Sequence, residues 1–333
     1  MAKVLRLHEY KGLDGIRLDD ISVTEPGHGQ VRINVDRFAL NYGDFEMFED
    51  EYTFSLGTLP ARFGDECSGV IDAVGQGVTG FKVGDKVSSL PWMNAGFGIA
   101  GEFAIVPADF VTHYPDNLSV DEASSVWIAY LTAYYPLFDD AGIKPDDYVL
   151  ITAASSSAGI AAMEVCRMVG AKTIGTSRST NNHEFLKEIG FDHVIAQTDG
   201  NMSESIMEFT SGKGVRIIYD PVGGAIVQEY ADAFAQNAIV FLYGGMDPTE
   251  TTLPEMQMTE KAVVFMPYTL YNYIYDKEGR ERGLKFCYDG LKSGQLRPFV
   301  EKVFPIEEFK DAFEYQQKAT RRVGKLLISP GGK

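Results

Sequence analysis

Residues 147–162 read D-Y-V-L-I-T-A-A-S-S-S-A-G-I-A-A, and the character of the residues changes twice within this stretch. The run from Tyr148 to Ile151 is apolar throughout, as expected for a strand with both faces covered in a parallel sheet. From Thr152 to Gly159 every side chain is small, and from Ile160 onward apolar residues recur at helical spacing. The stretch therefore predicts a buried strand, a turn of small residues and a helix.

This succession is typical of the phosphate-binding corner of a Rossmann unit. One small residue there permits a tight turn, a second lets the backbone approach a pyrophosphate, and a third lets helix and strand pack closely. The three positions are Ala153, Ser156 and Gly159, where a strict motif has three glycines. Small side chains, free backbone N–H groups and the positive end of a helix still favour the binding of an anion.

The chain beyond Asp147 alternates between predicted strands and helices, which indicates a doubly wound parallel sheet. The predicted strands are Tyr148–Thr152, Lys172–Thr176, His193–Ile195, Val215–Asp220, Ala238–Tyr243 and Ala262–Met266. The predicted helices are Gly159–Val169, Asn182–Ile189, Met202–Thr210, Ile226–Ala235 and a segment near Glu281–Ser293.

The first 120 residues or so read instead as β-rich, with glycine-containing turns between short apolar runs. A helix is predicted to start at 118–123, where Ser119 can cap it, and the segment to about Ala141 is predicted to be helical around Trp127, Leu131 and Tyr134. After Val303 the pattern predicts a strand, a helix over Ile306–Lys318 and a last strand over Lys325–Leu327. This tail continues no βαβ unit, so we expect it to return to the first domain.

Composition narrows the possible partners. With 333 residues the chain is long enough for two domains. Its net charge of −17 and pI near 4.7 argue against binding to nucleic acid or to an anionic membrane. The sequence contains no apolar run long enough to span a membrane and no signal peptide, and its three cysteines are far apart. We expect a cytoplasmic protein.

Eight segments, in this order along the chain, resemble the medium-chain dehydrogenase/reductase superfamily, in its zinc-free quinone-oxidoreductase-like branch. They are A-L-N-Y-G-D at 39–44, F-G-D-E-C-S-G-V-I at 63–71, A-V-G-Q-G-V-T-G-F-K-V-G-D-K-V at 73–87, Y-L-T-A-Y at 130–134, V-L-I-T-A-A-S-S-S-A-G-I-A-A at 149–162, D-P-V-G-G at 220–224, L-Y-G-G at 242–245 and V-G-K-L-L-I at 323–328. The resemblance implies an α/β protein with two domains. One is a GroES-like β-rich catalytic domain, residues 1–122 and 298–333, and the other a Rossmann NADP-binding domain, residues 123–297.

The resemblance also implies that no metal is bound. Zinc-dependent relatives have a Cys ligand where Asn41 stands and a His ligand where Asp65 stands. The lobe Pro91–Ala100 contains none of the closely spaced thiolates that a structural zinc needs. Without a Lewis acid, simple alcohol oxidation loses the group that lowers the hydroxyl pKa. Reduction of a quinone or of an activated double bond is therefore the expected reaction.

Cofactor choice depends on the end of the second Rossmann strand, G-T-S-R-S-T at 175–180. NAD enzymes place an acidic residue there to hold the ribose hydroxyls. Here Ser177 and Arg178 offer a hydroxyl and a planar guanidinium, which suit the 2′-phosphate of NADPH. The alternative is an ordinary exposed arginine in a polar loop.

Further cofactor contacts carry over from the resemblance by position. The backbone amides of Ser156, Ser157 and Ala158 are expected at the pyrophosphate, and the serine hydroxyls either add donors or bond locally. The remaining expected contacts with NADPH are Asn41, Thr132, Val222, Tyr243, Gly244, Gly245 and Lys325.

Tyr52 is the candidate catalytic residue. It lies eleven residues after Asn41, where the similar enoyl-thioester reductases place a catalytic tyrosine. It would donate the proton that follows hydride transfer. The alternative role for Tyr52 is that of an aromatic residue in the pocket wall, with solvent as the proton source. Two alternative functions of the protein also stay open: an enoyl-thioester reductase and, in a different class, a non-catalytic NADPH-binding sensor. A homodimer is a further expectation of the resemblance.

Overall fold

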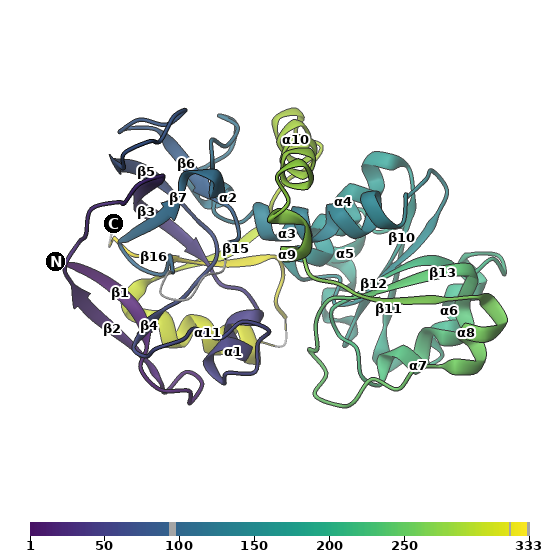
Figure 1. Ribbon diagram of the computed structural model, residues 1–333. Helices are drawn as coiled ribbons and strands as arrows, with labels where there is room; N and C mark the ends of the chain where they lie inside the picture. Colours follow the sequence, from purple (N-terminus) through teal and green to yellow (C-terminus); the bar gives the residue numbers. More distant parts are fainter. Residues whose placement is uncertain (93–97, 320, 332–333) are drawn as a thin grey trace. The chain divides into compact units, whose positions relative to one another are not determined.

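The computed structural model describes residues 1–92, 98–319 and 321–331, which form two compact units (Figure 1). Unit 1 comprises Met1–Ile128, Pro298–Ala319 and Lys325–Lys333, and unit 2 comprises Ala129–Arg297 and Thr320–Gly324. The C-terminal tail thus joins the N-terminal part of the chain. Assignment of the two units as a catalytic and an NADP-binding domain stays a prediction.

Unit 1 is built from antiparallel β-structure. Its strands are β1 (Ala2–Leu7), β2 (Ile16–Ile21), β3 (Gln30–Ala39), β4 (Ala61–Arg62), β5 (Cys67–Val74), β6 (Lys86–Ser89), β7 (Phe103–Pro107), β8 (Val111–Thr112), β15 (Val300–Pro305) and β16 (Lys325–Ser329). The first sheet has the order β2-β1-β4. The second runs β15-β16-β3-β5-β6-β8, with β7 also paired to β3. Among the strands of unit 1 that the structure describes, only β15 and β16 pair in parallel.

Short helices complete unit 1. They are α1 (Gly43–Phe48), α2 (Val120–Ala123) and α11 (Phe309–Lys318), with 3-10 turns at Ala108–Phe110 and Ile306–Glu308. Ser119 caps α2 as predicted, because its side chain accepts from the N–H of Glu122 while the Glu122 carboxylate accepts from the N–H of Ser119. Phe48, Phe63 and Phe313 meet edge to face or tilted within the core of this unit. That core packs α1 and α11 against the sheet residues.

Unit 2 contains one parallel sheet of six strands, in the order β11-β10-β9-β12-β13-β14. The strands are β9 (Tyr148–Ile151), β10 (Lys172–Ser177), β11 (His193–Ala196), β12 (Val215–Asp220), β13 (Phe234–Leu242) and β14 (Val264–Pro267). The chain order reverses between β9 and β12, and ligands of such sheets bind beyond the carboxyl ends of the strands at this reversal. The predicted α/β fold class, with a GroES-like sheet unit and a Rossmann sheet unit, is confirmed.

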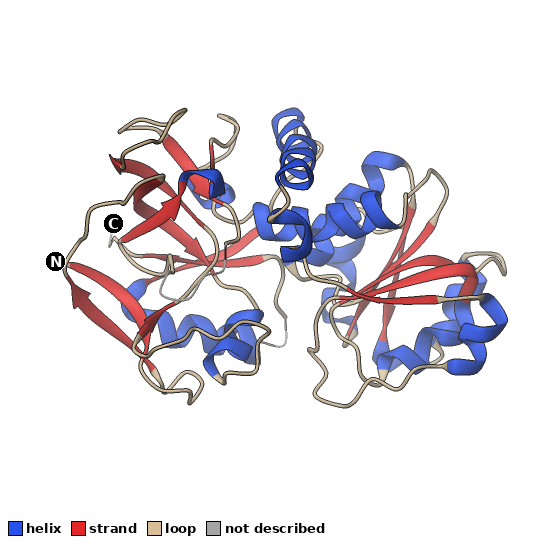
Figure 2. Cartoon of the chain, viewed as in Figure 1, coloured by secondary structure: helices blue, strands red, loops and turns tan. Residues whose placement is uncertain are grey.

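Helices lie on both sides of this sheet (Figure 2). They are α3 (Trp127–Tyr134), α4 (Ser157–Val169), α5 (His183–Ile189), α6 (Met202–Phe209), α7 (Ile226–Tyr230), α8 (Glu255–Lys261), α9 (Tyr271–Ile274) and α10 (Lys277–Ser293). A π-helix over Tyr135–Asp140 follows α3, and 3-10 turns cover Thr180–Asn182, Gln197–Asp199 and Ala231–Ala233. With helices on both faces, the central strands β9 and β12 are almost wholly buried.

Several predicted boundaries differ from the observed ones, and three of them have a clear physical reason. The helix predicted over Ile226–Ala235 ends at Tyr230, because Phe234 already pairs with Val215 as part of β13. The helix predicted near Glu281 begins at Lys277, where the Asp276 side chain accepts from the N–H of Gly279. The last Rossmann strand begins at Val264, since Ala262 ends α8 in the left-handed region with φ 51°.

Candidate active site

The turn between β9 and α4 has the backbone that a phosphate-binding corner requires. Ala153 has φ 46°, a left-handed conformation that glycine adopts more easily. At Gly159, an added Cβ would lie 2.8 Å from backbone atoms of Ala153 and Ala154, so only glycine allows this approach of helix to strand. Two of the three small-residue positions therefore perform the steric roles expected of them.

Ser156 is the N-cap of α4. Its Oγ accepts from the N–H of Gly159 at 3.1 Å, so this hydroxyl bonds locally. Ser157 and Ala158 follow in the first turn, where backbone N–H groups lack acceptors within the helix. Those N–H groups and the positive end of the α4 dipole are the local features suited to an anion.

A second segment of unit 2 holds this turn in place. The N–H of Gly324 donates to the Ser155 carbonyl at 2.7 Å, and Ser156 forms an isolated β-bridge with Gly324. The Asn182 amide donates to Ser155 Oγ at 3.1 Å and to the Arg322 carbonyl at 3.4 Å. The sequence alone did not predict these hydrogen bonds, because the residues that form them lie far apart along the chain.

At the carboxyl end of β10, Ser177 and Arg178 differ in their surroundings. Ser177 is buried, and its Oγ donates to the Ser179 carbonyl at 2.7 Å. Arg178, the next residue, is exposed. The exposed guanidinium is therefore accessible to a ligand, whereas the serine hydroxyl is already used to shape the loop.

Asp220, at the carboxyl end of β12, accepts several hydrogen bonds that join neighbouring segments. The sequence singles out its motif, D-P-V-G-G at 220–224, but does not predict this role. Its Oδ1 accepts from Thr152 Oγ1 at 2.5 Å and from the N–H groups of Val222 and Gly223, and its Oδ2 accepts from the Tyr230 hydroxyl at 2.8 Å. The carboxylate is fully buried. It ties the ends of β9 and β12 together, the two strands at which the chain order reverses.

The other predicted contacts of unit 2 occupy several environments. Val222 and Tyr243 are half-buried, Gly244 and Gly245 are exposed, and Thr132 is buried in α3. The Tyr243 ring lies 4.2 Å from that of Tyr219, centroid to centroid, and burial raises the pKa of the Tyr243 hydroxyl well above its usual value. Neutral tyrosine is thus the form present at this strand end.

Unit 1 holds a buried charged cluster that includes two of the predicted residues. Lys325 Nζ donates to Asn41 Oδ1 at 2.5 Å and lies 2.5 Å from Glu66 Oε1. Asp44 Oδ2 accepts from the N–H of Asn41 at 2.8 Å. Burial and the neighbouring Asp65 carboxylate raise the pKa of Asp44 well above its usual range. Asp44 and Glu66 were not among the predicted site residues, although both belong to motifs that the sequence singles out.

Tyr52 lies beside the first residue of α1. A Cβ added at Gly43 would be 3.0 Å from Tyr52 Cε2 and 3.5 Å from its hydroxyl oxygen. The ring is half-buried and packs against the core of unit 1. Gly43 follows Asn41 by two residues, so the local chain brings Tyr52 near the segment that carries Asn41 and Asp44.

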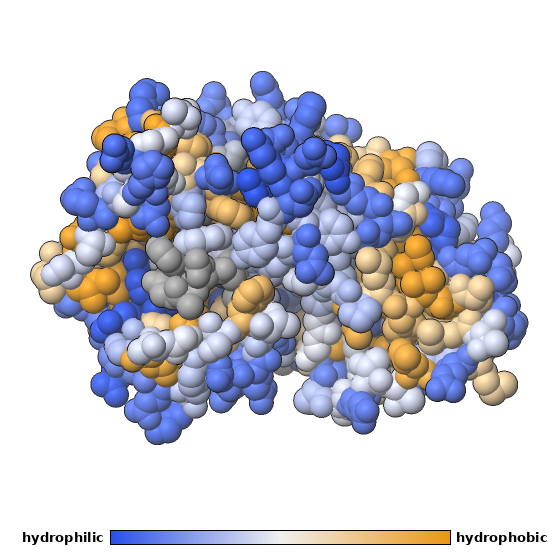
Figure 3. Space-filling model, in the orientation of Figure 1, coloured by the Kyte–Doolittle hydropathy of each residue, from blue (hydrophilic) through white to orange (hydrophobic). Residues whose placement is uncertain are grey.

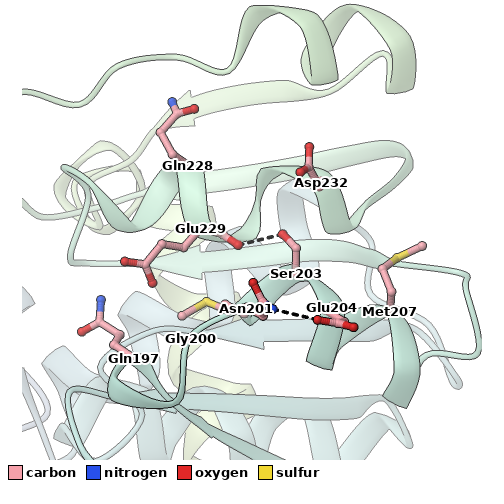
Figure 4. A pocket seen from close by; sticks show the side chains of 10 residues that line it. Gln197, Gly200, Asn201, Ser203, Glu204, Met207, Gln228, Glu229 and Asp232 are labelled. Atoms are coloured by element: carbon pink, nitrogen blue, oxygen red, sulfur yellow. Dashed lines mark hydrogen bonds between the residues drawn. The ribbon is translucent and has the colours of Figure 1, made fainter.

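A shallow cavity of about 640 Å³ in unit 2 is a separate feature (Figure 4). Its lining is acidic and amide-bearing, and Asn201 Nδ2 donates to Glu204 Oε2 at 2.9 Å within it. The lining residues are Gln197, Gly200, Asn201, Met202, Ser203, Glu204, Met207, Gln228, Glu229 and Asp232. None of the described residues that line this cavity is a cation, so the lining does not suit a phosphate.

The described residues contain neither a metal-binding group of side chains nor a helix that could cross a membrane. Among residues 1–92, 98–319 and 321–331, no three His, Cys, Asp or Glu side chains are grouped so that they could hold a metal ion. The lobe Pro91–Ala100 lies partly outside these ranges, at residues 93–97, and zinc independence stays a prediction. None of the helices in the described part of the chain is both long and apolar enough to cross a membrane.

Comparison with known proteins identifies the family. A model described as "Alcohol dehydrogenase GroES-like domain" matches residues 27–116, and one described as "Zinc-binding dehydrogenase" matches residues 158–283. The two together match more than half of the chain. The chain belongs to the medium-chain dehydrogenase/reductase superfamily, in its quinone-oxidoreductase-like branch. This confirms the resemblance read from the eight sequence segments.

Individual members of the superfamily are similar over nearly their whole length. A 2-haloacrylate reductase from Burkholderia sp is 28% identical, covering 97% of this chain and 98% of that protein. A human quinone oxidoreductase is 25% identical, covering 98% of each chain. The crystal structure of an Escherichia coli quinone oxidoreductase complexed with NADPH superposes with a TM-score of 0.89 at 22% identity, covering 98% of this chain and 100% of that one.

Proposed function

We propose that this protein is an NADPH-dependent, zinc-independent oxidoreductase that transfers hydride to a quinone or an α,β-unsaturated carbonyl compound. The turn from β9 to α4 carries the proposal. Its left-handed Ala153, its close approach at Gly159 and its capped helix start make a cradle for a pyrophosphate at the reversal of the sheet order. The names of the relatives support the reaction class, since they include a reductase of 2-haloacrylate and quinone oxidoreductases.

Different residues of unit 2 would bind different parts of NADPH. The N–H groups of Ser157 and Ala158 would hold the pyrophosphate, and the exposed Arg178 would hold the 2′-phosphate. Val222, Tyr243, Gly244 and Gly245, at the ends of β12 and β13, would contact the rest of the dinucleotide. Bound NADPH supplies a hydride, and the protein supplies orientation and a proton. The similar Escherichia coli quinone oxidoreductase is complexed with NADPH, which supports the same choice.

The test is NADPH oxidation, followed at its absorbance band, with a panel of quinones, enones and enoyl thioesters. We expect turnover of quinones or enones with NADPH and far less with NADH. Turnover restricted to enoyl thioesters would instead favour the enoyl-thioester reductase. NADPH binding without turnover of any acceptor would favour the non-catalytic sensor. Zinc content by elemental analysis checks the metal proposal, and one bound zinc per chain would contradict it.

Tyr52 is the proposed proton donor. Replacement of Tyr52 by Phe keeps the ring that packs near Gly43 and removes only the hydroxyl. We expect kcat to fall by about a hundredfold, the usual contribution of a positioned acid, with NADPH affinity unchanged. Tyr10, also half-buried in unit 1, offers a matched control as Tyr10→Phe. Unchanged turnover of the Tyr52 variant would assign proton delivery to solvent.

A homodimer is the proposed assembly. β14 is an edge strand of the parallel sheet, and Val264 on it is 53% exposed. An exposed edge offers unpaired backbone groups, and the same edge on a second copy can pair with it antiparallel about a two-fold axis. Figure 3 shows an apolar area among hydrophilic side chains on the face of unit 2 in view. The cytoplasmic location expected from composition stays a prediction.

A further inference from the structure

The ammonium of Lys325 is fixed between two partners inside unit 1. It donates to Asn41 Oδ1 at 2.5 Å on one side and lies 2.5 Å from Glu66 Oε1 on the other. Glu66 Oε2 accepts from the N–H of Ile128 at 3.1 Å, so the carboxylate is held as well. Lys325 is 3% exposed and Glu66 is 1% exposed. A paired lysine at this depth is held in one geometry by its partners.

This arrangement orients the Asn41 carboxamide. Because Oδ1 accepts from the ammonium, Nδ2 must face away from it. Nδ2 is buried and finds no hydrogen-bond acceptor among the residues that the structure describes. A buried donor without an acceptor costs about 1–3 kcal/mol, and native structures retain few of them. A ligand oxygen at Nδ2 would remove that cost.

The ammonium also changes the chemistry of the amide. A cation that donates to an amide oxygen draws electron density from the amide nitrogen, so the N–H groups become stronger donors. Glu66 balances the charge of Lys325 in the buried site, which allows the cation to remain there. Asn41 is therefore a polarised donor with a fixed direction and an unused N–H.

We infer that Lys325 positions and polarises Asn41 so that Asn41 Nδ2 donates to a carbonyl oxygen of the reacting complex. The inference rests on the proposed reductase function. When the β-carbon of an enone or quinone forms its new C–H bond with the transferred hydride, the π electron pair moves toward the carbonyl oxygen. A donor already aimed at that oxygen stabilises the developing negative charge. The proton that completes the reduction comes from Tyr52 or from solvent.

Two carbonyl oxygens share this chemistry, that of the acceptor and that of the nicotinamide carboxamide. Asn41→Asp distinguishes them, because it keeps the size of the side chain and a partner for Lys325 but removes the donor. With an acceptor oxygen, we expect kcat/KM to fall about a hundredfold and the Kd for NADPH alone to stay unchanged. With the nicotinamide oxygen, that Kd rises as well. A variant with unchanged kcat/KM and unchanged Kd would overturn the inference.

Asn34→Asp is the matched control, since it makes the same chemical change at an exposed position of β3. We expect it to retain wild-type kcat/KM and Kd. The wild-type protein tests the underlying function separately. Absence of wild-type turnover with every acceptor would reject the reductase function, whereas wild-type turnover with an unaffected Asn41 variant rejects this inference alone.

A second pair of substitutions tests the positioning role of Lys325. Lys325→Met alone leaves a buried Glu66 carboxylate without its partner and risks unfolding, so it is combined with Glu66→Gln. We expect the folded double variant, checked by circular dichroism, to lose kcat about tenfold, because the donor remains but is neither polarised nor fixed. Adding Asn41→Asp to this double variant should lower kcat by a smaller factor than Asn41→Asp does in the wild type, because Lys325 and Asn41 act through one hydrogen bond. If the kcat reductions caused by the double substitution and by Asn41→Asp simply multiply, Lys325 does not act through Asn41.

Discussion

Asp44 shows how far the fold changes the chemistry of a single residue. The carboxyl belongs to the first turn of α1 and is fully buried, and burial is the first cause of its raised pKa. Asp65 and Glu66 raise the pKa further, whereas the N–H of Asn41 and the ammonium of Lys325 lower it. Asp44 therefore holds its proton more tightly in the folded protein than in the unfolded chain.

This raised pKa predicts a pH dependence of stability. Between the unfolded pKa of 3.8 and the higher folded one, the unfolded chain has released the Asp44 proton and the folded chain has not. The contribution of Asp44 to stability is thus present at low pH and is lost as pH rises through this window. Asp44→Asn abolishes the titration, so we expect the variant to gain stability relative to the wild type between about pH 4 and about pH 7. Urea unfolding at both values measures this.

The exposed Asp50, just beyond the end of α1, provides a control as Asp50→Asn. That variant should follow the pH dependence of the wild type. If the difference between Asp44→Asn and the wild type does not change with pH, the Asp44 carboxyl is ionised in the folded protein and the prediction is wrong.

Arg178 is the residue on which the choice of NADPH depends. Its guanidinium is exposed at the carboxyl end of β10 and can meet a 2′-phosphate with charge-assisted hydrogen bonds. We expect Arg178→Ala to raise the Kd for NADPH by roughly ten- to a hundredfold, since such bonds contribute about 1.5–3 kcal/mol. The Kd for NADH should not change. Fluorescence titration measures both.

Lys172 lies at the opposite end of the same strand and is also exposed, so Lys172→Ala removes one positive charge away from the site. It should leave both dissociation constants at wild-type values. If the Arg178→Ala variant still prefers NADPH over NADH, another residue determines the cofactor specificity.

At the scale of elements, the start of α4 combines two tasks. Ser156 ends the turn and caps the helix, and the N–H groups of the first turn stay available beyond it. The helix therefore depends on this side chain for stability, and the proposed cofactor depends on the helix for its anion site. The left-handed Ala153 just before it shows that the turn keeps its shape without the first glycine of the usual motif.

Two substitutions at Ser156 separate these tasks. Ser156→Ala removes the cap, and we expect it to lower the free energy of unfolding by about 1 kcal/mol. Ser156→Asp retains a capping oxygen and favours the helix dipole, so stability should be kept. Its carboxylate would repel a pyrophosphate, however, and we expect weaker NADPH binding. Urea unfolding and fluorescence titration give the two readouts.

The neighbouring Ser157 is the control, because its hydroxyl is not the cap of α4. Ser157→Ala should change stability by less than Ser156→Ala does. Equal affinity of Ser156→Asp and the wild type for NADPH would mean that the pyrophosphate does not bind at this helix start.

At the scale of the whole molecule, the open edge of the sheet in unit 2 is the feature that favours self-association. We expect the wild-type protein to be a dimer in solution and Val264→Lys to be a monomer, because a lysine on an edge strand opposes pairing with another edge. Light scattering after size-exclusion chromatography measures the mass. Val83, 62% exposed in a turn of unit 1, provides the control variant Val83→Lys. A monomeric wild type, or a dimer that survives Val264→Lys, would contradict the prediction.

Much of the fold could be predicted because its signals are local. The strand at Tyr148, the capped start of α2 and the alternation beyond Asp147 follow from neighbouring residues alone. Helix α1 was not predicted, since its sequence has no marked helical period. The helix predicted to about Ala141 is an α-helix only as far as Tyr134 and continues as a π-helix over Tyr135–Asp140. The helix predicted through Ala235 failed because pairing of Phe234 with Val215 outweighs local preference.

Some features of the candidate site also follow from the local sequence, whereas others depend on tertiary contacts. The sequence by itself determined the strand–turn–helix at 147–162, because steric size, capping and apolar spacing act within a few residues. It also determined family membership through eight short motifs. Only the tertiary structure decided that Lys325 meets Asn41, 284 positions away, and that Glu66 balances its charge. Which charges are buried together depends on how β16 packs beside β3, and no local pattern in the chain encodes that contact.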